Sequence, residues 1–323
     1  MKLFTSRLIL ATAALALLIG VTFFLMRQRD MPDEASLIER RSPTQDLDVD
    51  SIDRVEIQRP GSSKIVLEKT SDGFRMKEPL EVGIEPNAAE SLLRRLASLE
   101  IDSVAATKER FHERLEIDDS RAIALRLFSD GTLLHDLRIG AYRSQTTMIR
   151  EAGSEIVLAA RNNLRSLADR GVDELRDKAI FNVDSSKIRA LEFHGPDRAL
   201  RFIRSDAEED FVADEGVTIE QYNPSTLRSR ALTLARLRAI GFANEDADPN
   251  ELGLDPPRAR VVMELEGGER HELAIGGEES RGIYVQRVVE PPVYVLPKAT
   301  AERMMPDREE LESERTEGSQ GSD

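Results

Sequence analysis

The chain has 323 residues, 40% of them hydrophobic and 33% charged, which is enough for two ordinary domains that each bury a core. The 60 acidic residues outnumber the 45 basic ones and give a formal net charge of −15, so we expect no nucleic-acid partner and no surface attracted to anionic lipid. The absence of cysteine excludes disulfides, thiolate nucleophiles and cysteine-based metal sites.

An uncharged apolar stretch of 19 residues, 8–26, lies near the N-terminus with basic residues on both sides. A helix of this length spans about 28 Å, which matches the apolar core of a bilayer. The alternative is a cleaved secretory signal, whose apolar part usually has about 7 to 15 residues and ends in a small-x-small site. Because this stretch ends in Phe-Phe-Leu-Met-Arg, we predict an uncleaved transmembrane anchor within residues 1–29.

Charge counting does not orient this anchor, because Lys2 and Arg7 before it are matched by Arg27 and Arg29 after it. We favour the short end inside, since long C-terminal domains translocate with little regard to charge. The expected location is the bacterial inner (cytoplasmic) membrane, crossed once, with the C-terminal body in the periplasm or outside. Residues 30–47 are polar with two prolines and are expected to form a flexible stalk.

The body contains one unit twice, at an offset near 136 residues. Ile52-Asp-Arg-Val-Glu-Ile57 corresponds to Ile188-Arg-Ala-Leu-Glu-Phe193, and both alternate apolar and polar residues as half-buried strands do. Two further short strands are predicted in each unit, around 65–67 and 74 in the first and around 200–203 and 211 in the second.

An amphipathic helix follows the first strands of each unit, after Pro86-Asn87 and after Asn223-Pro224. Asn223 is expected to cap its helix with Pro224 at the first helical position. The predicted apolar stripes are Leu92, Leu93, Leu96 and Leu99 in the first helix, and Leu227, Ala231, Leu234, Leu237 and Ile240 in the second.

The closest match between the copies lies beyond the helices, where Leu115-Glu-Ile-Asp-Asp-Ser-Arg-Ala122 corresponds to Leu252-Gly-Leu-Asp-Pro-Pro-Arg-Ala259. A hairpin follows, turning at Asp130-Gly131 or at Gly267-Gly268. The return strands read His135-Asp-Leu-Arg-Ile-Gly140 and His271-Glu-Leu-Ala-Ile-Gly276. Two more strands and a short helix complete each unit, at 148–150, 156–158 and 163–168 in the first, and at 284–286, 293–295 and 300–305 in the second.

The predicted fold class is therefore α+β, with two tandem copies of a mainly antiparallel β-sheet unit, each with packed helices. The units span residues 48–170 and 181–305, joined by an ordered connector, 171–180. The acidic residues 306–323 are expected to form a disordered tail.

These motifs resemble a bacterial family of membrane-anchored proteins known as a domain of unknown function (number four-three-four-zero). The residues that carry the likeness are Leu252-Gly-Leu-Asp-Pro-Pro257, Leu273-Ala-Ile-Gly276, Tyr284-Val285, Val293-Tyr-Val295 and Leu175-Arg-Asp-Lys178. It covers about residues 48–303, and the first copy departs from it with Glu116 for the glycine and Asp119-Ser120 for the prolines. The resemblance implies one N-terminal anchor and genes often found beside ABC-type transporter subunits and gliding-motility-like auxiliary proteins. The resemblance assigns no catalytic residues to this chain.

A histidine beside a carboxylate, at His135-Asp136 and His271-Glu272, is the strongest candidate for general-base or metal chemistry. Neighbouring residues of a strand point to opposite faces, however, so each histidine and its adjacent acid cannot easily act together. We therefore interpret both histidines as solvent-side structural residues of their hairpins.

Asp118 and Asp255 stand beside a turn, where a carboxylate readily accepts backbone N–H bonds. Arg121 and Arg258 could hold an anionic ligand, but a salt bridge to the nearby aspartate is the plainer interpretation. All six residues, His135 and His271 included, are candidate structural or interaction positions.

Nucleophile, phosphate-loop and dinucleotide motifs are absent, and His112-Glu113-Arg114-Leu115 has Glu116 where a zinc hydrolase needs its second histidine. We expect no catalytic residue, cofactor or metal. The predicted function is a non-catalytic, single-pass membrane-anchored envelope protein, an accessory or scaffold of an ABC-type transporter or envelope complex. One alternative is an extracytoplasmic module that binds a glycan or peptide in the cleft between the two repeats, although 5% aromatic residues and no Trp suit sugar stacking poorly. Another is a hydrolase with an unfamiliar site.

Overall fold

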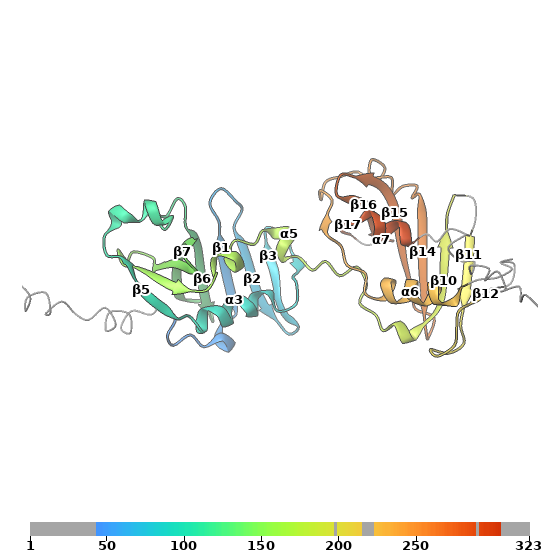
Figure 1. Ribbon diagram of the computed structural model, residues 1–323, viewed down its shortest axis with the longest axis horizontal. Helices are drawn as coiled ribbons and strands as arrows, with labels where there is room; N and C mark the ends of the chain where they lie inside the picture. Colours follow the sequence, from blue (N-terminus) through green and yellow to red (C-terminus); the bar gives the residue numbers. More distant parts are fainter. Residues whose placement is uncertain (1–42, 197–198, 215–222, 289–290, 305–323) are drawn as a thin grey trace, which may run out of the picture. The chain divides into compact units, whose positions relative to one another are not determined.

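The computed structural model describes residues 43–196, 199–214, 223–288 and 291–304 (Figure 1). The predicted anchor, the tail at 306–323 and residues 30–42 of the predicted stalk lie outside the described residues. Within the described ranges, no helix is both long enough and apolar enough to cross a membrane.

The first unit is built on one antiparallel nine-stranded sheet with strand order β4-β3-β2-β1-β6-β7-β8-β9-β5. Its strands are β1 (Arg54–Gln58), β2 (Ile65–Thr70), β3 (Gly73–Glu78), β4 (Val82–Gly83), β5 (Ile101–Ala106), β6 (Ile123–Ser129), β7 (Thr132–Arg143), β8 (Thr146–Glu151) and β9 (Val157–Arg161). Its α-helices are α3 (Ala88–Ala97), α4 (Arg165–Ala168) and α5 (Val172–Leu175).

The second unit has an antiparallel eight-stranded sheet with strand order β12-β11-β10-β14-β15-β16-β17-β13. Its strands are β10 (Ile188–His194), β11 (Ala199–Ile203), β12 (Val212–Ala213), β13 (Gly241–Phe242), β14 (Ala259–Leu265), β15 (Arg270–Glu279), β16 (Gly282–Arg287) and β17 (Val293–Leu296), and its α-helices are α6 (Pro224–Ala235) and α7 (Lys298–Arg303). The prediction of an α+β chain with two antiparallel sheets is confirmed.

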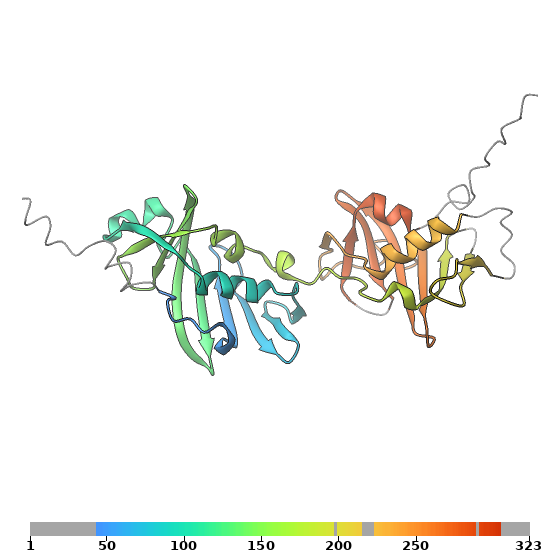
Figure 2. The same cartoon turned by 60° about the horizontal axis from the view of Figure 1, so that its bottom comes forward.

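The long helix of each unit, α3 or α6, lies across one face of its own sheet (Figure 2). The main core of each unit forms between that helix and the alternate strand residues that face it. Asn223 caps α6 as expected, because its side chain accepts a hydrogen bond from the Ser225 N–H at 3.1 Å. The apolar stripes are confirmed except at their ends, where Leu99 is only partly buried and Ile240, beyond the end of α6, is 49% exposed.

The two units repeat one topology, in which strands, a long helix, one strand and a four-strand meander follow one another. Among the described residues, four strands (β1–β4) precede the helix in the first unit and three (β10–β12) in the second, and the short edge strand β4 was not predicted. The strand after the helix, β5 or β13, was not predicted. It pairs with the last strand of the meander, β9 or β17, so its position depends on a partner more than 50 residues away in the chain. β13 has only two residues, too few to show an alternating pattern.

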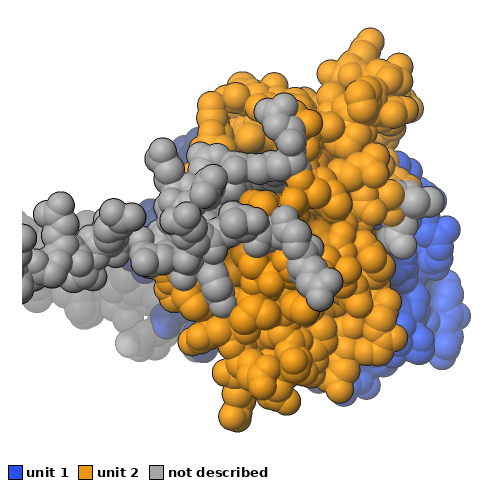
Figure 3. Space-filling model, turned by 90° about the vertical axis from the view of Figure 1, so that its right-hand side faces the viewer, with its two compact units in different colours: residues 1–175 blue, residues 176–323 orange. Residues whose placement is uncertain are grey.

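The chain divides into compact units at Leu175 and Arg176, which are drawn in blue and orange in Figure 3. This boundary falls inside the connector predicted at 171–180. Pro43 and Thr44 are buried in the first unit, and the Thr44 hydroxyl donates a hydrogen bond to the carbonyl of Leu96 at 2.8 Å. The folded part of the first unit therefore includes residues 43–47, which were predicted to belong to the stalk.

The hairpin β7–β8 and its counterpart β15–β16 contain the same irregularity. The pairing register shifts between Ile139 and Tyr142 in the first unit and between Ile275 and Glu278 in the second. We call these two positions the β-bulges.

A glycine in each β-bulge lies directly against a backbone carbonyl. A Cβ atom on Gly140 would lie 2.7 Å from the Leu115 carbonyl oxygen, and one on Gly276 would lie 2.5 Å from the Leu252 carbonyl oxygen. Residues 115–122 and 252–259, which we call the motif segments, therefore pack onto the β-bulges at a distance that only glycine allows.

We expect Gly140→Ala to lower the free energy of unfolding of the first unit by about 1–3 kcal/mol, because the added methyl group forces the motif segment away from the sheet. Denaturant unfolding of the full chain, followed by far-UV circular dichroism, measures the change. Gly171→Ala is the matched control in the same unit. Its Cβ would meet only the flexible ends of Arg59 and Glu174, at 3.4 and 3.5 Å, so the change is expected within about 0.5 kcal/mol. Equal effects of the two substitutions would contradict the close packing.

Candidate functional site

Asp118 and Arg121 make the contacts expected of them in the first motif segment. The Ser120 backbone N–H donates to Asp118 Oδ1 at 3.1 Å, and the Ser120 hydroxyl donates to the same oxygen. Arg121 Nε lies 3.7 Å from Asp118 Oδ2, and Arg121 Nη2 lies 2.6 Å from Glu113 Oε1. Partial burial acts to raise the pKa of Asp118, but the two Ser120 hydrogen bonds and the charge of Arg121 outweigh it and leave that pKa below its usual range.

Asp255 and Arg258 are exposed, and neither side chain makes a hydrogen bond or an ion pair with any described residue. The expectation that Asp255 accepts a backbone N–H bond is wrong. Its counterpart of Ser120 is Pro257, which has neither an N–H nor a hydroxyl to donate.

Two buried or nearly buried arginines converge on Asp119 in the first unit. Arg138 Nε lies 2.8 Å and Arg150 Nη2 2.9 Å from the same Asp119 oxygen. Arg150 is only 6% exposed and also donates from Nε to the Ile117 carbonyl at 2.9 Å. The hydrogen bond from Arg138 is the main cause of a lowered Asp119 pKa, with the charges of both arginines adding to it against the effect of burial. These three side chains form the arginine clamp, which fastens the first motif segment to β7 and β8.

The second unit has no equivalent of the arginine clamp. Pro256, Ala274 and Gln286 stand at the positions of Asp119, Arg138 and Arg150. Ala274 belongs instead to a small apolar cluster with Leu252 and Leu254 of the second motif segment. The arginine clamp was not predicted from the sequence. An alignment of the two copies nevertheless shows that all three of its residues are replaced in the second copy.

The candidate histidines lie on the helix-covered face of their sheets. His135 pairs with the core residue Leu127, and His271 pairs with the core residue Met263. Both histidines are half-buried. The interpretation of them as solvent-side residues is therefore wrong, because the alternation of each strand places them on the same face as the core.

The ring of His271 lies near one aromatic ring and one carboxylate, since its Nε2 is 3.1 Å from Glu269 Oε1. The rings of His271 and Phe181 lie 5.6 Å apart between centroids. The adjacent acids point away and pair with arginines, Asp136 with Arg126 at 3.2 Å and Glu272 with Arg260 at 3.3 Å. Across the described ranges, no three His, Asp or Glu side chains are grouped so that they could hold a metal ion.

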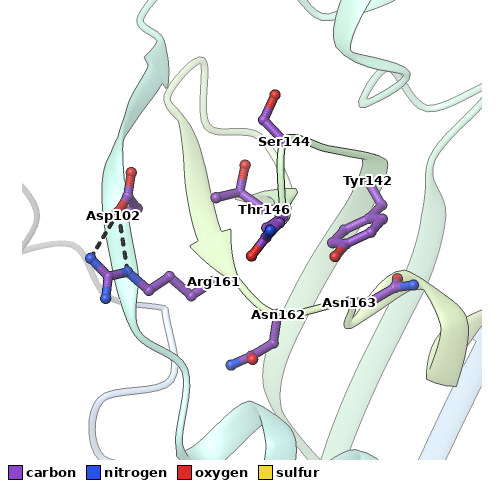
Figure 4. A pocket seen from close by; sticks show the side chains of 8 residues that line it. Asp102, Tyr142, Ser144, Thr146, Arg161, Asn162 and Asn163 are labelled. Atoms are coloured by element: carbon purple, nitrogen blue, oxygen red, sulfur yellow. Dashed lines mark hydrogen bonds and ion pairs between the residues drawn. The ribbon is translucent and has the colours of Figure 1, made fainter.

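A polar pocket of about 590 Å³ opens on the first unit, where the β7–β8 turn meets the end of β9 and the edge strand β5 (Figure 4). It is lined by Asp102, Tyr142, Ser144, Gln145, Thr146, Arg161, Asn162 and Asn163. Ser144, Gln145 and Asn162 have positive φ angles of 51°, 64° and 77°. The two loops are tied together, since the Asn162 N–H donates to the Gln145 carbonyl at 3.2 Å and the Thr147 hydroxyl donates to the Asn162 carbonyl at 2.7 Å.

The charged residues of the polar pocket neutralise each other. Arg161 Nε and Nη2 each lie 3.1 Å from Asp102 Oδ1, as the dashed lines in Figure 4 show. The side chains of Tyr142, Ser144, Gln145 and Asn162 make no hydrogen bond to any described residue. The pocket can therefore offer hydroxyl and amide groups and one aromatic ring to a ligand without first breaking internal contacts.

The geometry defines the class of protein as a chain of two repeated α+β units. Each unit is built on one sheet, and a helix covers one face of that sheet. A family model described as "Domain of unknown function (DUF4340)" matches residues 75–257 and 220–314. The matched residues make up more than half of the chain, so the chain belongs to this family. Comparison with curated proteins and with solved structures found no match.

The lowered pKa of Asp119 predicts a pH-dependent contribution to stability. A carboxylate with a depressed pKa stabilises the folded state above its unfolded value of about 3.9, and that contribution is lost as the pH falls through the lower folded pKa. We expect Asp119→Asn to destabilise the first unit by up to about 1 kcal/mol at neutral pH, since solvent screens this exposed carboxylate, and by less at acidic pH.

Urea unfolding of the full chain at several pH values between neutral and acidic measures this difference. As a control, the Asp119→Asn substitution is also made in a chain that carries Arg138→Met. Its effect on stability should then depend less on pH, because the main partner of the Asp119 carboxylate is gone. If the difference in stability between the unchanged chain and the Asp119→Asn variant stays constant with pH, or grows in acid, the role of the clamp is contradicted.

Proposed function

We propose that this chain is a non-catalytic, single-pass membrane-anchored envelope protein that serves as an accessory of an ABC-type transporter or envelope complex. The observation that carries the proposal is the uncharged 19-residue stretch at 8–26, which is long enough for a bilayer and is bounded by basic residues. In this proposal the two units lie in the periplasm or outside.

The contacts of the candidate residues support a structural role for the first motif segment and for the hairpins that carry His135 and His271. Asp118 and Asp119 are engaged by Ser120 and by arginines, and the neighbouring acids of both histidines pair with arginines of their own sheets. The gene neighbourhoods that the family resemblance implies support a transporter or envelope complex as the partner.

Membrane insertion is tested by cell fractionation of bacteria that express the full chain or a variant lacking residues 8–26. We expect the full chain to remain in the inner-membrane fraction after an alkaline carbonate wash, because about 19 apolar residues stay in the bilayer core. The shortened variant should be released as soluble protein. A C-terminal alkaline phosphatase fusion, active only outside the cytoplasm, reports the orientation. Release of the uncleaved full chain by carbonate would contradict the anchor.

The accessory role is tested by crosslinking in intact cells, followed by affinity purification in detergent and identification of the bound proteins. We expect subunits of an inner-membrane transporter or envelope complex to be recovered with the full chain. The control is residues 1–42 alone, which carry the apolar stretch without the two units. Recovery of the same proteins with this control, or of no such subunit with the full chain, would contradict the role.

The polar pocket favours a second candidate function, an extracytoplasmic module that binds a small polar ligand. Its volume of about 590 Å³ falls in the range of ligand sites, and it lies within the first unit. The two functions are compatible, because the pocket and the apolar stretch belong to different parts of the chain.

A further inference from the structure

We propose that the polar pocket of the first unit is a binding site for an uncharged saccharide, with Tyr142 as the ring against which a sugar stacks. This inference rests on the second candidate function and names its ligand class. It is independent of the membrane anchor.

The charge of the pocket selects against ions. Arg161 lies 3.1 Å from Asp102, and Glu100 lies 3.9 Å from the same guanidinium, so the positive charge is already compensated and an anionic ligand gains less there than at an unpaired arginine. A cationic ligand likewise gains less at Asp102, whose charge Arg161 compensates. An uncharged ligand disturbs neither partner and keeps the ion pair as a fixed polar wall.

The hydrogen-bonding groups suit a polyhydroxyl ligand. The hydroxyl of Ser144 and the amides of Gln145 and Asn162 have no partner among the described residues, and an amide offers donors and an acceptor side by side. Adjacent sugar hydroxyls present the same combination of donor and acceptor. These three side chains stand on backbone with positive φ, in a two-residue turn and a loop that are hydrogen-bonded to each other, so the fold fixes the backbone positions from which they extend.

Tyr142 supplies the apolar contact that sugars need. The residue is 41% exposed although it lies within β7, and in Figure 4 its ring stands at the wall of the pocket with the hydroxyl toward the interior. The C–H face of a sugar ring stacks on an aromatic ring. The low aromatic content of the chain is therefore less of an obstacle than the composition alone indicates, because one of only four tyrosines lines the pocket.

An extended peptide is a poorer fit to the same place. A peptide would gain the most binding free energy by adding a strand to the free edge of β5. The pairing of β5 with β9 shifts register twice, between Ile101 and Ser103 and between Val104 and Ala106. Such bulges twist an edge and hinder the addition of a strand.

The equivalent place in the second unit has different chemistry. Glu278, Arg281 and Gly282 stand at the positions of Tyr142, Gln145 and Thr146. Glu278 pairs with Lys298, and Arg281 Nε lies 3.1 Å from Glu279 Oε1. The second unit has neither the aromatic ring nor the free amide at this turn, so it provides a matched control.

The experiment is a titration of the full chain, kept in a detergent without a sugar headgroup, with cellobiose, maltose or N,N′-diacetylchitobiose. Binding is followed by saturation-transfer NMR and by tyrosine fluorescence, which no Trp obscures. We expect saturable binding of at least one of these disaccharides at or below about 10 mM. Tyr142→Ala should weaken it about tenfold or more, whereas Tyr142→Phe, which keeps the ring, should stay within about threefold.

Asn162→Gly is the second variant, because glycine accepts the positive φ while the amide is lost. It should also weaken binding, and Arg281→Ala at the equivalent turn of the second unit should leave binding unchanged. Thermal unfolding of each variant confirms that the unit stays folded. Absence of disaccharide binding, or binding that neither pocket variant weakens, overturns the proposal. Saturable binding of tri-alanine or inorganic phosphate at Tyr142 in place of a sugar overturns the saccharide class but leaves the second candidate function in place.

Discussion

In each unit, a backbone carbonyl of the motif segment lies against the glycine of a β-bulge, at a distance that leaves no room for a side chain. The Leu115 carbonyl approaches Gly140, and the Leu252 carbonyl approaches Gly276. In the second unit the contact is also a hydrogen bond, since the Gly277 N–H donates to the Leu252 carbonyl at 2.7 Å. Because a Cβ atom would force these backbones apart, the arrangement depends on glycine at both bulges.

This close approach gives each sheet a second apolar cluster on the face that the long helix does not cover. In the first unit, Ile117 of the motif segment packs with Met148 and Val157, which alternate with the residues of the main core. In the second unit, Leu252 and Leu254 pack with Ala274. A short segment that consists mostly of turns thus covers part of the open face of a sheet, and part of its backbone is satisfied by hydrogen bonds within its own turn, such as that from the Ala122 N–H to the Asp118 carbonyl at 2.9 Å.

The same backbone supports different side-chain chemistry in the two copies. Glu116 and Gly253 both have positive φ, 52° and 67°, at corresponding positions. Glycine adopts this conformation freely, whereas Glu116 adopts it while its carboxylate pairs with Arg143 at 3.1 Å and lies 3.7 Å from Arg165. The first unit therefore combines a less favoured backbone conformation at Glu116 with ionic contacts, and it also contains the polar pocket.

Local patterns predicted the parts of the fold that depend on local interactions. Alternation located the strands, the Asp130-Gly131 turn located a hairpin, and Asn223 located a helix start. The edge strands β5 and β13, the faces of the histidines and the polar pocket were missed. The two edge strands and the polar pocket depend on non-local pairing: Asp102 and Arg161 meet only because β5 joins β9 across the intervening meander. The faces of the histidines follow instead from local alternation, because His135 and His271 stand two residues before the core residues Leu137 and Leu273. The family resemblance identified the motif residues, but only the three-dimensional contacts explain them as the residues that hold the motif segment on a β-bulge.

Hydrogen–deuterium exchange of the full chain, resolved by peptide, tests most directly whether the motif segments are an integral part of both units. Residues 115–122 and 252–259 should exchange as slowly as the strands they cover, β7 and β15, and should lose protection together with them as denaturant is added. Fast exchange of either motif segment while its sheet remains protected would contradict this account, because the segment would then be a loose loop.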